Sequence, residues 1–347
     1  MNINLSDSLG QNLIINPSMD IAQRGTGPFV NTGYTVDRFT MTTGRSLSIN
    51  RVASVPTWSS SIYSLELTNA SLVTAPASYT TRLIHRVEGY NIRRLKGKNA
   101  IFSFNVKGNF NGQSSVTLGN SVLDQSFVQT YNITTGWTRV VIKISSNDFS
   151  VGTWDLFNGI GLDISWNLES SADLQSANTG SWQNSLILGT PSDYKFNDTV
   201  GNKVWISDVA LHEGIEEIPF ENLVRDYPKE LQLCQRYFEK SYDIDTPVGT
   251  VTRNGCSMCS LGNLAFSTRY EIKNGTFMTA KRATPAVSIY SVSTGTVSRI
   301  TRYNGPGDLV LSSIEHMSIR QVGDYLTTSA SDNGETKQFH WSADAEL

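Results

Sequence analysis

Short stretches in which apolar and polar residues alternate are the feature that most constrains the fold of this chain. Residues 160–168 read IGLDISWNL, with an apolar side chain at every second position, and residues 63–67 and 102–106 follow the same rule. Successive side chains of a strand point to opposite faces of a sheet, so each stretch predicts a strand with one buried face. Turn signals such as Asn111-Gly112 and Asn158-Gly159 separate the stretches. Many short strands with such turns predict an all-β sandwich or jelly roll.

One segment breaks the two-residue period. Residues 226–242 read DYPKELQLCQRYFEKSY, in which Tyr227, Leu231, Cys234 and Phe238 are spaced by four, three and four positions. This spacing places the four side chains on one face of a helix. The segment therefore predicts a single helix of about four turns.

The helix divides the chain into two predicted β domains. We expect an N-terminal jelly-roll β-sandwich over residues 1–222, a linking helix over 223–245 and a smaller C-terminal β domain over 246–347. Alternation returns after the helix, and hairpin turns are expected at Asn274-Gly275 and at residues 332–334. About a hundred residues remain after the helix, which is enough for a second core.

Charge and hydropathy exclude two classes of partner. The formal net charge is -3, from 28 Lys and Arg against 31 Asp and Glu, and no long basic block occurs, so we expect no nucleic-acid partner. The short basic cluster Arg93, Arg94, Lys96 and Lys98 fits a solvated loop better than a phosphate site, although both remain open. We expect no signal peptide, because residues 1–10 (MNINLSDSLG) lack a basic region and an apolar region. We expect no membrane insertion, because no apolar run approaches about 18 residues. The chain is expected to be made in a cytoplasm.

The three cysteines do not form a disulfide framework. Cys234, Cys256 and Cys259 are an odd number, and the C-x-x-C pair at 256–259 has no second pair to complete a structural zinc site. Packed or free thiols are the favoured interpretation, and a metal or redox role of Cys256 and Cys259 stays open.

Several blocks of sequence, in a consistent order, resemble a known family. Residues 12–26 (NLIINPSMDIAQRGT) resemble the opening of many bacteriophage tail-fibre and receptor-binding subunits, and residues 34–39 (YTVDRF) resemble their next block. Residues 204–214 resemble the closing strand of the jelly roll in that family, and residues 230–238 resemble the helix that follows. Residues 277–285 are similar to a later strand entry, with Ala-Lys-Arg where the family more often has Met-Arg.

The resemblance covers residues 12–240 well and becomes weaker beyond Pro285. It implies a jelly roll similar to carbohydrate-binding modules, carried on a phage tail and usually in trimers. It also implies other phage tail proteins as partners and the virion tail as the location. The fold of the C-terminal domain is not identified by it.

The resemblance also implies a structural calcium ion near the N-terminus. Asp20 and Asp208 match the two positions that such an ion bridges, and Asn16 lies beside the first. Calcium takes six to eight oxygen ligands, mostly carboxylate and carbonyl. The alternative is that both aspartates cap turns or pair with Arg24 or Arg38. No other cofactor is expected.

Candidate sugar-binding residues lie in the second half of the jelly roll. Trp154 and Trp182 stand in loop-like contexts, and Gln183 and Asn184 follow the second of them. Aromatic faces stack on sugar rings, and planar polar side chains bind hydroxyl groups. Core packing or a contact between subunits is the alternative for both tryptophans. Trp166 falls on the apolar side of its strand and is expected in the core.

Catalytic motifs are missing, so we expect no enzyme. None of the four histidines has metalloprotease spacing, and no G-x-S-x-G motif occurs. Three functions remain: a receptor-binding fibre that attaches the virion to a host surface glycan, a structural tail component such as a collar, nozzle or fibre adaptor, and a glycan depolymerase. Pairs of carboxylates suited to glycoside hydrolysis cannot be tested from sequence.

A homotrimer held by the C-terminal domain is predicted. The resemblance implies the trimer, and the strands after Gly249 carry more apolar residues than one small domain needs. The helix stripe docks on its own chain or meets two copies of itself on an axis. The residues expected at the trimer contact are Ile289, Tyr290, Val292, Val310, Leu311, Phe339 and Trp341.

Overall fold

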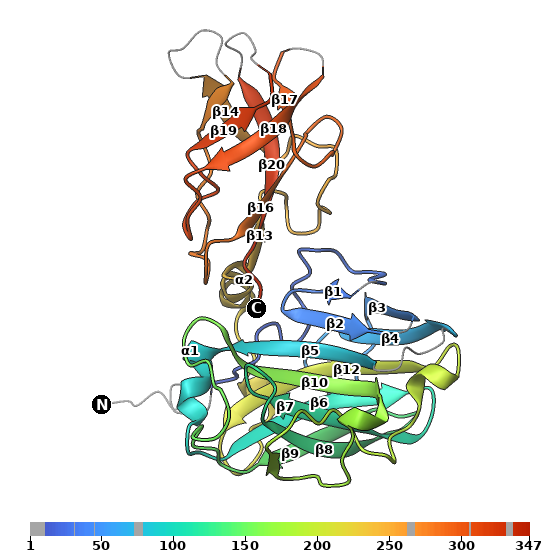
Figure 1. Ribbon diagram of the computed structural model, residues 1–347. Coiled ribbons are helices and arrows are strands. Elements are labelled where there is room, and N and C mark those ends of the chain that lie inside the picture. The colour runs from blue at the N-terminus through green and yellow to red at the C-terminus, as the bar shows by residue number, and fades with distance from the viewer. Residues whose placement is uncertain are drawn as a thin grey trace. The chain divides into compact units, whose positions relative to one another are not determined.

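The computed structural model describes residues 11–30, 32–44, 46–72, 79–261, 268–304, 307–330 and 336–347, so the turn predicted at 332–334 lies outside the described residues. The chain forms two compact units. The jelly-roll unit comprises the chain up to Ile21, Thr26–Tyr227 and Leu347, and the barrel unit comprises Ala22–Gly25 and Pro228–Glu346. Both units are built from strands, which confirms the predicted all-β fold (Figure 1).

The jelly-roll unit contains two antiparallel sheets. The seven-stranded sheet has the order β1 (Gly33–Tyr34), β2 (Phe39–Thr43), β5 (Thr80–Glu88), β10 (Ile160–Ser170), β7 (Gly112–Gly119), β8 (Ser126–Ile133) and β11 (Trp182–Gln183). The five-stranded sheet has the order β3 (Ser46–Val52), β4 (Ser64–Ser71), β12 (Lys203–Glu213), β6 (Ala100–Gly108) and β9 (Thr138–Ile144). Short helices connect them: α1 (Gly89–Ile92), η2 (Arg93–Leu95), η3 (Ala172–Leu174), η4 (Phe196–Asp198) and η5 (Phe220–Asn222).

The core of this unit follows from the alternation in β10. Trp166 is fully buried, and its ring centroid lies 5.6 Å from those of Phe102 and Phe104. The other face of β10 is also buried, because Arg86 pairs with Asp163 at 3.3 Å and Ser114 donates to the Asn167 carbonyl. The sequence predicted one solvated face, but polar partners from neighbouring strands cover it.

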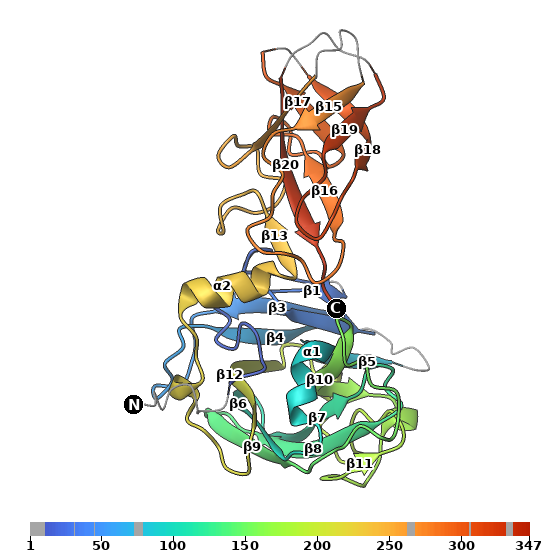
Figure 2. The ribbon, with the colours of Figure 1, turned by 90° about the vertical axis from the view of Figure 1, so that its left-hand side faces the viewer.

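The barrel unit shows a fold that the sequence did not identify. Its strands are β13 (Phe238–Lys240), β14 (Ser257–Leu261), β15 (Arg269–Ile272), β16 (Ala286–Tyr290), β17 (Arg299–Arg302), β18 (Asp308–Glu315), β19 (Tyr325–Thr328) and β20 (Lys337–Asp344). Hydrogen bonds run from β20 through β14, β15, β19 and β18 to β17, which pairs again with β20. Six strands therefore close into a small barrel, and closure leaves no free sheet edge among them. The second half of β20 extends from the barrel between β13 and β16 (Figure 2).

Closure of the barrel corrects the prediction about its apolar residues. Ile289, Val292, Phe339 and Trp341 are buried within their own unit and are not available for a trimer contact. Val310 remains 44% exposed. The four buried residues therefore belong to the core of their own unit, where Phe339 and Trp341 lie on β20 and Ile289 lies on β16, which pairs with β20.

The predicted helix is shorter in the structure. Helix α2 spans Tyr227–Gln235, nine residues instead of the 226–242 expected, and 223–245 is not one linking helix. The Tyr237 amide bonds to the Cys234 carbonyl, and Phe238 begins β13, which pairs with β20. Pairing with a long strand replaces the last helical turns, so Phe238 is buried on a strand. Tyr227, at the start of the helix, is 48% exposed. Within the described ranges, no helix combines the length and apolar character needed to cross a membrane.

Candidate functional site

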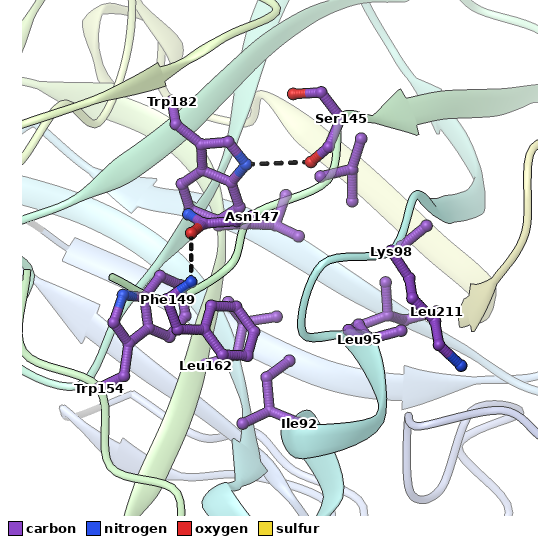
Figure 3. A pocket seen from close by; sticks show the side chains of 13 residues that line it. Ile92, Leu95, Lys98, Ser145, Asn147, Phe149, Trp154, Leu162, Trp182 and Leu211 are labelled. Carbon is purple, nitrogen blue, oxygen red and sulfur yellow. Dashed lines mark hydrogen bonds between the residues drawn. The ribbon is translucent and has the colours of Figure 1, made fainter. Parts of the chain in front are cut away.

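The structure brings together the two tryptophans that the sequence singled out. Trp182 lies on β11, and Trp154 lies in the loop before β10 (Figure 3). Their rings meet edge to face with centroids 5.6 Å apart. Trp154 stacks on Phe149 at 4.2 Å, and Trp182 contacts Phe127 at 5.7 Å. We call Phe127, Phe149, Trp154 and Trp182 the aromatic cluster.

The geometry of the aromatic cluster favours packing. The indole N–H of Trp154 donates to the Val151 carbonyl at 2.8 Å, and that of Trp182 donates to the Ser145 carbonyl at 3.1 Å. The cavity beside the rings measures about 20 Å³ and is lined mainly by apolar side chains. Such a volume holds about one water molecule and no sugar ring. A sugar platform on the outer faces of these rings stays a prediction.

Gln183 and Asn184 hold the neighbouring loop. Gln183 donates to the Asn178 carbonyl at 3.0 Å and accepts from Ser176 at 3.1 Å. Asn184 accepts a hydrogen bond from Gln125 at 3.3 Å. These bonds use side-chain groups that the sequence assigned to sugar hydroxyls, and that assignment stays a prediction.

Of the residues predicted to bind calcium, Asn16 is committed to backbone partners. Its side-chain oxygen accepts from the Ile21 amide at 2.9 Å, and its amide group donates to the carbonyls of Ile21 and Asp37. The residue adopts a positive φ of 60°, which Asn tolerates better than most residues. Asn16 therefore shapes the tight turn at the start of the jelly-roll unit.

Asp20 and Asp208 influence each other electrostatically. Burial raises the pKa of Asp20, a hydrogen bond with Ser18 and the charge of Arg51 oppose that rise, and the carboxylate of Asp208 adds to it. Arg51 also donates to the Asp20 carbonyl at 2.8 Å.

The donor set for calcium is incomplete by side chains alone. In the described part of the chain, no three His, Cys, Asp or Glu side chains gather into a metal-binding group. Two carboxylates would need several backbone or water oxygens to reach the six to eight ligands of calcium. Calcium at Asp20 and Asp208 stays a prediction.

A larger cavity lies on the outer face of the five-stranded sheet. It measures about 280 Å³, and we call it the Trp58 cavity. Asn105 on β6 lies opposite Arg139 on β9 and opposite Ser207 on β12 in the sheet register. A β-bulge after Ser207 carries Asp208, whose positive φ of 51° redirects the strand there. The lining residues are Trp58, Ser59, Ser60, Asn105, Arg139, Asp208, Phe220 and Glu221.

The aromatic wall of this cavity is open to solvent. Trp58 lies in the loop between β3 and β4, in a turn closed by the Ser59 amide and the Pro56 carbonyl at 3.0 Å. Trp58 is 63% exposed, and every other tryptophan in the described part of the chain is more deeply buried. A tight turn with an exposed indole beside a polar cavity offers a flat surface for a ring-shaped ligand.

The polar wall is ordered by hydrogen bonds. Arg139 donates to the Asp208 carbonyl at 2.6 Å, to Ser103 at 2.7 Å and to Glu217 at 2.8 Å. Asn105 donates to Oδ2 of Asp208 at 2.6 Å, whereas Oδ1 is buried and has no hydrogen-bond partner. The wall therefore presents fixed donors and acceptors to a ligand before it binds.

Sequence reasoning missed the Trp58 cavity because its residues come from five separate segments. Asn105 and Arg139 occupy outward positions of their strands, where polar residues are ordinary, and the bulge that redirects Asp208 has no sequence signature. One signal was available: Trp58 stands in the turn-rich stretch Pro56–Ser60, where a large aromatic residue has no strand to pack on.

The basic cluster and the cysteines do not add a second site. The guanidinium of Arg93 lies over the rings of Tyr90 and Phe157, and Lys98 pairs with Glu213 at 2.7 Å. None of the three cysteines forms a disulfide bond, and burial raises the pKa of Cys259 to about 12. A buried thiol with a raised pKa is unreactive, so Cys259 packs as an apolar residue.

Comparison with known proteins finds solved structures of low similarity to this chain. No protein-family model matches it, and no curated protein matches it in sequence. It is similar to the enzymatically active domain of tailspike protein 4 from bacteriophage CBA120, with 13% identity and a TM-score of 0.33. That match covers 58% of this chain and 21% of the tailspike chain, so the matched part of this chain spans about a fifth of that chain.

Two further structures are similar over nearly their whole length. A candidate sugar-binding protein from Bacteroides thetaiotaomicron shows 14% identity and a TM-score of 0.37 and covers 59% of this chain and 100% of its own. The family 11 carbohydrate-binding module of the cellulosomal cellulase Lic26A-Cel5E of Clostridium thermocellum shows 13% identity and a TM-score of 0.28. It covers 56% of this chain and 98% of its own. At these identities and TM-scores the likenesses carry no argument about what this chain binds.

Proposed function

We propose that this chain is a receptor-binding subunit of a bacteriophage tail fibre whose jelly-roll unit binds a glycan of the host surface. The observation that carries the proposal is the Trp58 cavity, which combines an exposed indole with the ordered polar side chains of Asn105, Arg139 and Asp208. Sugars are bound by this combination, because C–H groups stack on an aromatic face while amides and carboxylates take hydroxyl groups.

The place on the phage rests on the sequence blocks at residues 12–26, 34–39 and 204–214, which resemble tail-fibre subunits. It follows that the protein acts on the virion tail after synthesis in the host cytoplasm, as a homotrimer attached to other tail proteins. Immuno-gold labelling of intact virions tests this part: label at the tail supports it, and label confined to the capsid contradicts it.

Two alternatives make different predictions for the same purified protein. A structural tail component, such as a collar or nozzle, would bind no host glycan. A depolymerase would release sugars, and the Trp58 cavity does contain two carboxylates, Asp208 and Glu221, the residue type that glycoside hydrolysis uses. Our proposal is binding without cleavage, so we expect no reducing sugar to appear when the protein is incubated with host envelope.

The decisive experiment compares two exposed aromatic residues of the jelly-roll unit on a glycan array. Trp58 is 63% exposed and Phe157 is 62% exposed, so Trp58→Ala and Phe157→Ala remove similar surface area at different places. We expect W58A to weaken glycan binding by about tenfold or more, and F157A to leave it unchanged. Equal loss from both variants, or no binding by the wild-type chain, would contradict the proposal.

A further inference from the structure

We infer that the Trp58 cavity accepts an uncharged sugar residue and rejects acidic sugars such as uronic and sialic acids. This inference rests on the proposed function and names the chemical class of glycan at that same site. The balance of charge around the cavity carries the rejection of acidic sugars, and one buried acceptor together with the size of the cavity supports the acceptance of a single sugar residue.

The balance of charge around the cavity is negative. Asp208 and Glu221 line it, and Arg139 is the one cationic side chain among the lining residues. The guanidinium of Arg139 is paired with Glu217 at 2.8 Å and donates to the Asp208 carbonyl. The carboxylate of Glu217 therefore already offsets the positive charge of Arg139. The carboxylate of an acidic sugar would meet like charges at short range, which opposes binding.

The nearest other cation on this face of β6 has partners of its own. Lys107 is two positions along from Asn105 and therefore points to the same side of the strand. Its ammonium donates to Ser54 at 3.2 Å and lies 4.6 Å from the ring centroid of Trp205. Lys107 is not among the residues that line the cavity.

Asp208 supplies the unsatisfied acceptor. The residue is 3% exposed, and its Oδ2 accepts from Asn105, but Oδ1 has no hydrogen-bond partner. Oδ1 is closed to a water-sized probe, so a sugar hydroxyl reaches it only if the side chains around Asp208 move. A hydrogen bond to Oδ1 would then remove the cost of a buried polar atom without a partner. A sugar hydroxyl can donate to a carboxylate oxygen, whereas an ionised carboxylate group can only accept. A sugar hydroxyl therefore suits this acceptor, and the discrimination against acidic sugars comes from the charge around the cavity.

The volume of the cavity fits one sugar ring. Drug-sized ligands occupy pockets of about 300–1,000 Å³, so a cavity of about 280 Å³ suits a smaller molecule. The indole of Trp58 gives that ring a flat apolar surface on one side. The remaining sugars of a longer glycan would lie outside the cavity.

Saturation-transfer NMR on the full chain tests the selectivity. The ligands are the methyl glycosides of glucose, galactose and N-acetylglucosamine, set against glucuronic acid and N-acetylneuraminic acid, all at the same ionic strength. We expect at least one neutral sugar to bind and both acidic sugars to bind about tenfold more weakly. The W58A variant should lose the signal of the neutral sugar.

Charge removal tests the cause of that selectivity. Glu221→Gln keeps the size of an exposed side chain and removes one negative charge from the cavity, so the preference for neutral over acidic sugars should fall several-fold. Glu213→Gln is the matched control, because Glu213 is an exposed glutamate of the same unit that pairs with Lys98 outside the cavity. An unchanged preference in E221Q, or the same fall in E213Q, would overturn the charge argument.

The remaining outcomes separate this inference from the proposed function. An acidic sugar that binds as tightly as the neutral ones overturns the inference and leaves glycan binding intact. If no glycan binds at all, both are overturned. A signal that disappears with chelator and returns with calcium would mean that Asp208 holds a metal ion and not a sugar hydroxyl, which also overturns the inference.

Discussion

The aromatic cluster and the Trp58 cavity place tryptophan side chains in opposite surroundings. In the aromatic cluster, Trp154 and Trp182 pack against each other, and both indole N–H groups bond to nearby carbonyls. In the Trp58 cavity, a single exposed indole stands beside polar groups from three adjacent strands. The contrast teaches that residue type and a loop-like context do not distinguish a packed tryptophan from an exposed one, because the surrounding fold decides between them.

The largest effect is expected when the packing of the aromatic cluster is disrupted. Trp182→Ala should destabilise the jelly-roll unit by about 3 kcal/mol, since truncating a packed aromatic ring removes its contacts with Trp154 and Phe127. Binding of the neutral sugar should be unchanged in the folded variant. Urea denaturation measures the first quantity and NMR titration the second. A stable variant that no longer binds sugar would reverse the roles we assign to the two sites.

Lowering the pH should destabilise the jelly-roll unit through the buried side chain of His85, and this should separate the variants of the two tryptophans further. His85 bonds to the Ile15 carbonyl at 3.0 Å, and burial lowers its pKa from 6.5 to about 3. Below pH 6.5, His85 therefore binds a proton in the unfolded chain but stays neutral in the folded chain. The contribution of neutral His85 to the free energy of unfolding is fully present above pH 6.5. The free energy of unfolding then falls by about 1.4 kcal/mol per pH unit as the pH drops towards 3.

Because W182A begins with less stability, it should unfold at a higher pH than W58A. Circular dichroism from pH 7 to pH 4 measures both transitions. Stability that stays level between pH 6.5 and pH 4.5 would contradict a neutral His85, and unfolding of W58A at the higher pH would contradict the contrast between the two tryptophans.

A smaller effect is expected from the support of the cavity wall. Glu217→Gln removes the charged partner that orients Arg139, a pair whose side chains are 29% and 21% exposed. The stability loss should be about 0.5–1 kcal/mol, as for partly exposed ion pairs. Sugar affinity should fall about twofold to threefold, because Arg139 is then less ordered. Lys143→Gln, which breaks the exposed pair with Glu216, is the control that should change neither quantity.

The smallest effect concerns calcium. An ion bound by Asp20 and Asp208 only in the native state would stabilise the jelly-roll unit, so a chelator would lower its melting temperature. We expect a shift of no more than a few degrees, because the Arg51 guanidinium already counters the charge of Asp20. Differential scanning calorimetry with and without chelator measures it. An unchanged melting temperature would contradict calcium binding by Asp20 and Asp208.

The sequence by itself determined the class of fold and part of the core. Alternation over residues 160–168 predicted a strand with Trp166 inside, and β10 places Trp166 in the core. It did so because side-chain direction on a strand is set locally, residue by residue. The all-β class follows from many such stretches, and it needs no knowledge of which strands pair.

Tertiary structure decided where elements end and which residues meet. The helix expected over 226–242 stops at Gln235 because Phe238–Lys240 pairs with β20, a partner about a hundred residues away. Strand pairing also closed the barrel, and four of the seven apolar residues that had suggested a trimer surface are buried in the core of that unit. Long-range pairing is invisible to a local pattern, because the same alternation suits an edge, a sandwich or a barrel.

The candidate site shows the same division. Residue type and context selected Trp154 and Trp182, and the fold joined them, but as packing. The Trp58 cavity depends on the register that sets Asn105 beside Arg139 and on a bulge that carries Asp208. Those three residues stand 34 and 69 positions apart in sequence, and only hydrogen bonding between strands makes them neighbours. A binding surface built across strands is thus a property of the register, which the sequence encodes but does not display.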